Sequence, residues 1–96
     1  MKSPDTPKNV SYANEIAVQA LAFLAEDMDR MGRFLALSGL DPSTIRVAAR
    51  EPGFLVGVLD HVIGDDSLLV AFAAGNQLSP QQIVDARNTL AGPPVH

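Results

Sequence analysis

The sequence predicts an all-α protein, a compact irregular bundle of five to six short helices. Apolar residues recur at intervals of three and four, the spacing of one face of an α-helix. No stretch alternates apolar and polar residues as a half-buried strand would. Serine, aspartate, proline and glycine separate the apolar segments at positions where helices begin and end. With 96 residues, the chain has room for one domain.

The first two helices are predicted on either side of Asp27. The first covers residues 12–26 behind Ser11, and its apolar stripe contains Ala13, Ile16, Ala17, Ala20 and Leu24. Asp27 can accept hydrogen bonds from the free N–H groups of the second helix, which covers residues 28–38 and ends before Gly39. The residues expected to point inward from it are Met31, Phe34, Leu35 and Leu37.

Two prolines mark the next two helix starts. Asp41 as N-cap and Pro42 at the first helical position predict a short third helix that ends near Arg50. Pro52 begins a fourth helix that continues to residue 63. Within it, Gly57 is interpreted as a point where another helix approaches closely.

The fifth helix follows an acidic pair. Gly64 ends the fourth helix, and Asp65 or Asp66 caps the fifth over residues 67–74. Gly75 and Asn76 are expected to supply the left-handed residues that end this helix, because both types tolerate a positive φ.

The sixth helix has the clearest start. Ser79 is followed by Pro80 and, three residues after the serine, by Gln82, which is a capping-box arrangement. The helix that begins there is expected to end at Gly92.

The chain divides into one domain and two tails. Residues 1–10 are polar and contain two prolines, and we predict a disordered tail there, a single helical domain over residues 11–92 and a short tail over 93–96. We find no leader-like segment and no run of about 20 apolar residues, so we expect a cytoplasmic protein outside the membrane. We expect a monomer or a weak homodimer.

Composition excludes several classes of function. Without cysteine, the chain has no thiol nucleophile, no disulfide and no cysteine-ligated zinc. A formal charge of −4 disfavours a general grip on nucleic-acid phosphates. No phosphate-binding loop, dinucleotide fingerprint or serine nucleophile elbow occurs. We therefore expect no enzymatic activity and no cofactor.

The basic residues suggest a surface for an acidic partner. Four of the seven lie on the second and third predicted helices: Arg30, Arg33, Arg46 and Arg50. Spacings of three and four residues place each pair on one helix face. The hypothesis is a protein-binding patch with an apolar rim around Leu37 and Leu40.

Local ion pairing is the competing interpretation of these arginines. Glu26 precedes Arg30 and Asp29 precedes Arg33 by four residues, with the acid in the favoured N-terminal position. Exposed pairs of this kind contribute only a few tenths of a kcal/mol. Under this interpretation the patch is an ordinary solvated face.

The end of the chain allows a second function. Ala71, Gly75 and Leu78 have the spacing of a helix-turn-helix, and the helix over residues 79–91 carries side chains able to read base edges: Gln81, Gln82 and Arg87. However, Gln81 stands where an apolar anchor is expected, and the segment has little positive charge. DNA binding is therefore the alternative hypothesis.

A metal site is disfavoured. Asp60, His61 and Asp65 lie close in sequence, but Gly64 is expected to end the helix between the last two. An open metal site needs at least three firmly held ligands. We expect none here.

Several apolar and capping segments together resemble a known family. They are FLALSGLDP at 34–42, PGFL at 52–55, Val58-Leu59-Asp60, Asp66 with Leu68, Leu69 and Phe72, and Leu78 with Pro80. Over residues 12–91 the chain resembles a small all-helical bacterial family catalogued as a domain of unknown function (number 3572). The resemblance implies a compact helical cytosolic domain and identifies no catalytic or binding residue.

These observations favour a non-enzymatic protein–protein interaction or regulatory module. Its partner would be another protein, met through the arginine patch. The alternative is a helix-turn-helix-like nucleic-acid-binding protein that uses the helix over residues 79–91.

Overall fold

The structure is a computed structural model that describes the backbone of residues 5–41, 43–51 and 53–92, with side chains from residue 10 onward. Six helices lie within these ranges, and no strand does: α1 (Asp5–Ala25), α2 (Met28–Ser38), α3 (Ile45–Ala48), α4 (Phe54–Ile63), α5 (Asp66–Gly75) and α6 (Pro80–Ala91). The predicted all-α fold is confirmed. None of the described helices is long and apolar enough to cross a membrane.

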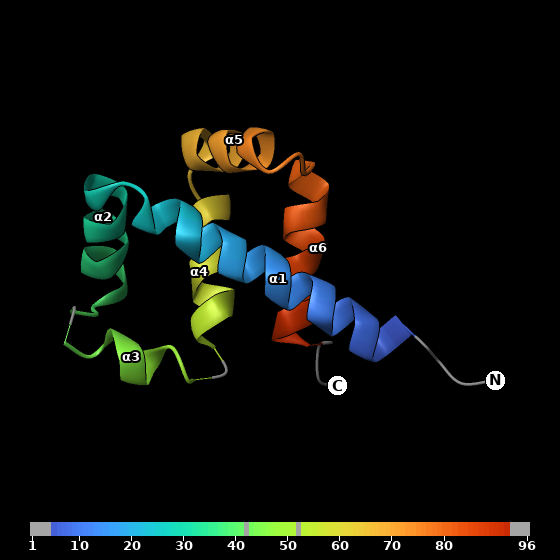
Figure 1. Ribbon diagram of the computed structural model, residues 1–96, viewed down its shortest axis with the longest axis horizontal. Helices are drawn as coiled ribbons and strands as arrows, with labels where there is room; N and C mark the ends of the chain where they lie inside the picture. Colours follow the sequence, from blue (N-terminus) through green and yellow to red (C-terminus); the bar gives the residue numbers. More distant parts are fainter. Residues whose placement is uncertain (1–4, 42, 52, 93–96) are drawn as a thin grey trace.

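Helix α1 crosses the middle of the molecule and packs against α6, α4 and α2 (Figure 1). Helix α2 stands beside α4 and runs in the opposite direction, while α5 lies across the ends of α4 and α6 (Figure 1). The short α3 bridges the lower ends of α2 and α4. In this arrangement α2 packs mainly against α1.

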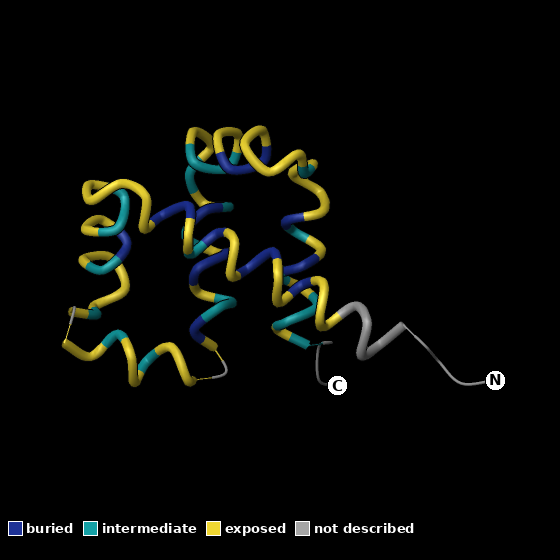
Figure 2. The backbone as a smooth tube through the Cα atoms, in the orientation of Figure 1, coloured by how far each residue is buried: buried dark blue, intermediate teal, exposed yellow. Residues whose placement is uncertain are grey.

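The core forms where α1 meets the other helices. Figure 2 shows buried residues along the centre of α1 and on the facing sides of α4 and α6. The rings of Phe23 and Phe72 pack with centroids 5.4 Å apart and join α1 to α5. Phe34 meets Phe54 edge to face at 6.1 Å and joins α2 to α4. These rings belong to the same apolar core as Ile83 and Ala86 of α6, so the five longer helices share one apolar centre.

The predicted start of the first helix at residue 12 is wrong, because α1 begins at Asp5. Pro7 falls in the first turn, where backbone N–H groups have no partner within the helix and a proline is tolerated. Residues 5–10 of the expected tail are therefore helical. Residues 1–4 and the expected tail over 93–96 lie outside the described part of the chain.

Three predicted helix ends are confirmed in detail. The Asp27 carboxylate accepts hydrogen bonds from the N–H groups of Asp29 and Arg30, and Gly39 ends α2 with a φ of 75°. At the start of α6, the Ser79 hydroxyl accepts from the N–H of Gln82 at 3.1 Å, and Gln82 Oε1 accepts from the N–H of Ser79 at 2.8 Å. These devices use contacts within four residues, which a sequence displays directly.

The third helix is shorter than predicted. Asp41 accepts hydrogen bonds from the N–H groups of Ser43 and Thr44 and from the Ser43 hydroxyl, and the hydrogen bond from that hydroxyl is the main cause of the lowered pKa of Asp41. The carboxylate thus closes a turn over residues that were expected to be helical. Helix α3 begins only at Ile45 and ends before Arg50. Pro42 and Pro52 lie outside the described residues.

The end of α5 also differs from the prediction. The Asp65 carboxylate caps its start through the N–H of Leu68, as expected, but Gly75 remains helical and the left-handed residue is Gln77, with a φ of 57°. The N–H of Leu78 donates to the carbonyl of Ala73 at 2.9 Å, which is the long hydrogen bond of a Schellman motif. The motif places its left-handed position two residues beyond Gly75.

We predict that Gln77→Gly stabilises the protein, because glycine adopts a positive φ without a steric cost. The expected gain is about 0.5–1 kcal/mol in the free energy of unfolding, or a rise of several degrees in Tm. Urea titration followed by circular dichroism measures it. Gly39→Ala, at the equivalent position of α2, is the matched control and should lower stability by a similar amount. An unchanged or lower stability of the Gln77 variant would contradict this interpretation.

Candidate functional site

A groove runs between the antiparallel helices α2 and α4. Three adjoining hollows of about 140, 300 and 230 Å³ form it. The first and second share His61, and the second and third share Phe34, Ser38 and Gly57. The three hollows thus follow one another along α2 and α4, with the two arginines at one end and apolar residues along the rest.

The apolar part of the groove is lined by aromatic, aliphatic and glycine residues. Phe34 and Phe54 lie at its base, and Leu37 stands at its rim with 73% of its surface exposed. The prediction that Leu37 points inward is wrong. Phe34 is the one buried residue of α2, because this helix stands at the side of the molecule and a broad apolar stripe has no second partner there.

Gly57 keeps this part of the groove open. Among the described residues, and apart from the adjoining backbone of α4, a Cβ atom placed on it meets no atom within 4 Å. The interpretation of Gly57 as a point of close helix approach is therefore wrong. An apolar residue at this position would project into the space between α2 and α4, where the glycine leaves room.

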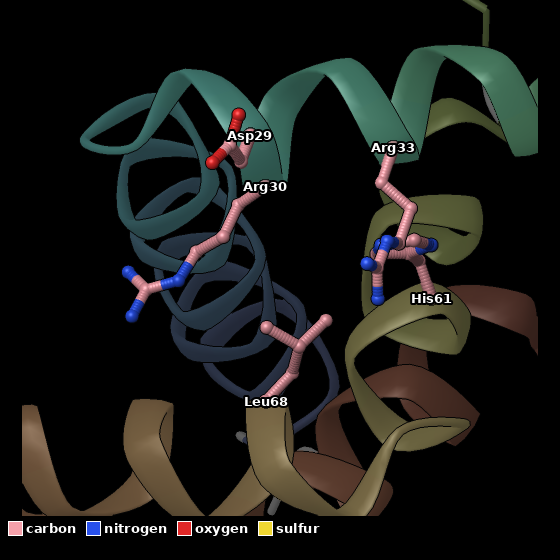
Figure 3. A pocket seen from close by; sticks show the side chains of 5 residues that line it. All are labelled: Asp29, Arg30, Arg33, His61 and Leu68. Atoms are coloured by element: carbon pink, nitrogen blue, oxygen red, sulfur yellow. The ribbon is translucent and has the colours of Figure 1, made fainter.

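Arg30, Arg33 and Asp29 of α2 line the basic hollow together with His61 of α4 and Leu68 of α5 (Figure 3). The guanidinium of Arg30 lies over the ring of Phe23, 4.3 Å from its centroid. Figure 3 shows the side chain of Arg33 descending toward the imidazole of His61. The structure thus brings the first predicted arginine pair into one concave site.

His61 forms the boundary between the basic and apolar parts. Its ring meets Phe34 edge to face, with centroids 5.2 Å apart, and its Nε2 is buried without a hydrogen-bond partner in the part of the chain that the structure describes. Burial lowers the pKa of His61, Asp65 opposes this effect, and Arg33 adds to it. A lowered pKa keeps the imidazole neutral at pH 7.

The second predicted arginine pair does not join this site. Arg46 lies on α3, but Arg50 follows the end of that helix, so the predicted shared face is not formed. Neither arginine lines the basic hollow, although Ala48 and Glu51 line the far end of the groove.

The ion pairs of the competing interpretation do not form on α2, although Arg33 is exposed, as that interpretation expects of a solvated face. Neither Glu26–Arg30 nor Asp29–Arg33 forms, and among the described residues the one ion pair joins Arg87 to Asp60 at 2.7 Å. Arg30 instead contacts the Phe23 ring. The guanidiniums of the basic hollow are therefore not neutralised by a direct ion pair.

The side chains proposed for nucleic-acid binding are engaged within the protein. Gln81 donates to Asp85 at 2.9 Å, and Gln82 donates to the Tyr12 hydroxyl at 2.9 Å while capping α6. Arg87 is paired with Asp60, and this hydrogen bond raises the arginine pKa. Base contacts by these residues would require breaking these interactions.

The candidate metal ligands do not converge. Asp60 is directed to Arg87, and Asp65 caps α5. Within the described ranges, no group of three histidine, aspartate or glutamate side chains is placed to hold a metal ion.

Sequence reasoning missed His61 and Leu68 as neighbours of the arginine pair. Both come from helices far along the chain, and no local pattern indicates which face of α4 turns toward α2. One feature of the sequence could have indicated an open position at Gly57: the glycine lies inside an apolar helix and does not cap it.

Comparison with known proteins identifies a family but no activity. The profile of a family described as "Protein of unknown function (DUF3572)" matches residues 10–93. Searches of curated proteins and of solved structures gave no match.

We predict that Gly57→Ala stabilises the protein by about 0.5–1 kcal/mol, because glycine inside a helix is less favourable than alanine and the new methyl group meets no neighbour. Gly32→Ala, at another helical glycine with open space around it, should give a similar gain. Thermal unfolding compares them. A loss of stability in the Gly57 variant alone would show that another group approaches this position.

Proposed function

The chain belongs to the DUF3572 family, for which no function is given, and we propose that it is a non-enzymatic protein-interaction module. The groove between α2 and α4 is the proposed docking surface. Its occupant is an amphipathic helix of another protein. The absence of enzymatic activity and cofactors belongs to the same proposal, as do a cytoplasmic location and a monomeric or weakly dimeric state.

The open apolar groove is the observation that carries this proposal. Leu37 is largely exposed at its rim, and Gly57 leaves space between the two helices. Exposed apolar surface that is concave and bordered by polar residues is typical of interaction sites. Two antiparallel helices offer a straight channel into which a third helix can insert side chains at intervals of three and four residues.

Charge indicates which helix fits. The basic hollow at one end of the groove contains two arginines that form no direct ion pair with any described residue. A partner helix with an apolar stripe and an acidic residue at one end would match both parts. We therefore prefer an acidic amphipathic helix to a basic one.

The nucleic-acid alternative has less support. The side chains of α6 that would read bases already form hydrogen bonds with Asp85 and Tyr12 and an ion pair with Asp60. The formal charge of −4 also opposes a phosphate backbone.

A selection of helical peptides on the purified protein tests the proposed function. We expect enriched peptides with apolar residues at i, i+3 or i+4, and i+7, and dissociation constants on the order of micromolar by fluorescence anisotropy. Gly57→Leu, which fills the groove, should weaken binding at least tenfold. Gly32→Leu is the matched control, because Gly32 also faces open space but does not line the groove, and it should leave affinity unchanged.

A second variant covers the case in which Gly57→Leu alters folding. Leu37→Ser changes an exposed rim residue and should weaken the same peptides with little effect on stability. Failure to enrich any peptide, or peptides that bind the wild type and both groove variants equally, would contradict the proposed function.

A further inference from the structure

We infer that the hollow between Arg30 and Arg33 is a carboxylate-binding site that receives an aspartate or glutamate side chain of the partner helix. This inference rests on the proposed function and specifies the partner. The two parts of the groove then act differently on that helix. The apolar part buries its stripe, and the basic part fixes its position along the groove.

The charge of the hollow matches a single carboxylate. Arg30 and Arg33 contribute two positive charges, and Asp29 contributes one negative charge on the same wall. His61 stays neutral at pH 7, because its Nε2 is buried without a partner. Asp65 adds a second negative charge close to His61, so the two guanidiniums suit an anion of no more than one charge. A phosphate dianion would add repulsion from Asp29.

An aromatic ring positions one of the two arginines, Arg30. The Phe23 ring holds the Arg30 guanidinium in a fixed place, so less side-chain freedom is lost when an anion binds. In Figure 3 the guanidiniums lie on opposite sides of the space above Leu68. The Arg30 side chain runs away from Arg33, and Arg33 reaches down toward His61 within the hollow. An anion beside Arg33 would accept charged hydrogen bonds from it, and hydrogen bonds of this kind are the stronger ones in proteins.

The position of the hollow also fixes the register of the partner. Arg33 and Leu37 are four residues apart on α2 and therefore lie on one face, one turn apart. A partner acidic residue at Arg33 thus places the next apolar side chain of its helix near Leu37. This geometry predicts an acidic residue directly beside the apolar stripe, at one end only.

Acetate is the probe for the isolated site. We would label the arginine side chains with ¹⁵N and follow their Nε–Hε resonances during titration with sodium acetate, inorganic phosphate or sodium chloride at constant ionic strength. We expect saturable shifts at Arg30 and Arg33 with acetate, at a dissociation constant on the order of 10 mM, and no saturation at Arg46 or Arg50. Arg33→Gln should weaken acetate binding at least fivefold, and Arg46→Gln should leave it unchanged.

The three titrations distinguish a carboxylate site from a phosphate site and from general attraction of anions. Equal shifts with chloride, or equal shifts at Arg46, would show that no such site exists. Tighter binding of phosphate than of acetate would overturn the carboxylate assignment in favour of a phosphate-bearing ligand. Thermal unfolding of Arg33→Gln checks that the exposed substitution leaves the fold intact.

A second arm uses the groove-binding peptides and separates this inference from the proposed function. Replacing their acidic residue by glutamine should weaken binding about tenfold to the wild type and much less to Arg33→Gln. If the peptides bind the groove but neither change alters affinity, the carboxylate site is wrong and the docking function stands. If acetate binds at Arg33 but no peptide occupies the groove, the docking function is wrong.

Discussion

The buried face of α1 is the constraint on which the rest of the structure depends. Helix α1 packs against α6, α4 and α2, so the positions of these three helices are fixed by one common neighbour. Ala13, Ala17 and Ala20 are almost fully buried on it, and their small side chains let the partner helices approach closely. Ile16 and Leu24 on the same face supply apolar area. Removing this face would leave the remaining short helices without a shared core.

The groove follows from the same arrangement. Helices α2 and α4 are both anchored to α1, and they meet each other through the Phe34 ring, which contacts Phe54 and His61. Aromatic rings span a wider gap than small residues do, so the backbones remain apart. Gly57 fills none of that gap, and Leu37 remains at its rim. An opening between two helices is therefore compatible with a fully packed centre.

Local chemistry made much of the fold predictable, whereas the site depended on long-range packing. The Asp27 cap, the left-handed Gly39 and the Ser79–Gln82 capping box use contacts between near neighbours. The predictions failed where the same residues can form two different local hydrogen-bonded structures. The Asp41 carboxylate closes a turn instead of opening a helix, and a Schellman motif moves the left-handed position to Gln77.

For the site, helical spacing correctly placed Arg30 and Arg33 together, but it could not reveal that His61 and Leu68 complete the hollow. The glycine at position 57 indicates that no side chain is present there, but the sequence does not show which residues face it across the groove.

Native-state hydrogen exchange of Ile16→Val tests the central role of α1 most directly. This loss of one buried methylene should lower the exchange free energy of protected amides in α1, α4 and α6 by the same amount, about 1 kcal/mol. A decrease confined to amides of α1 would contradict its role as the common anchor.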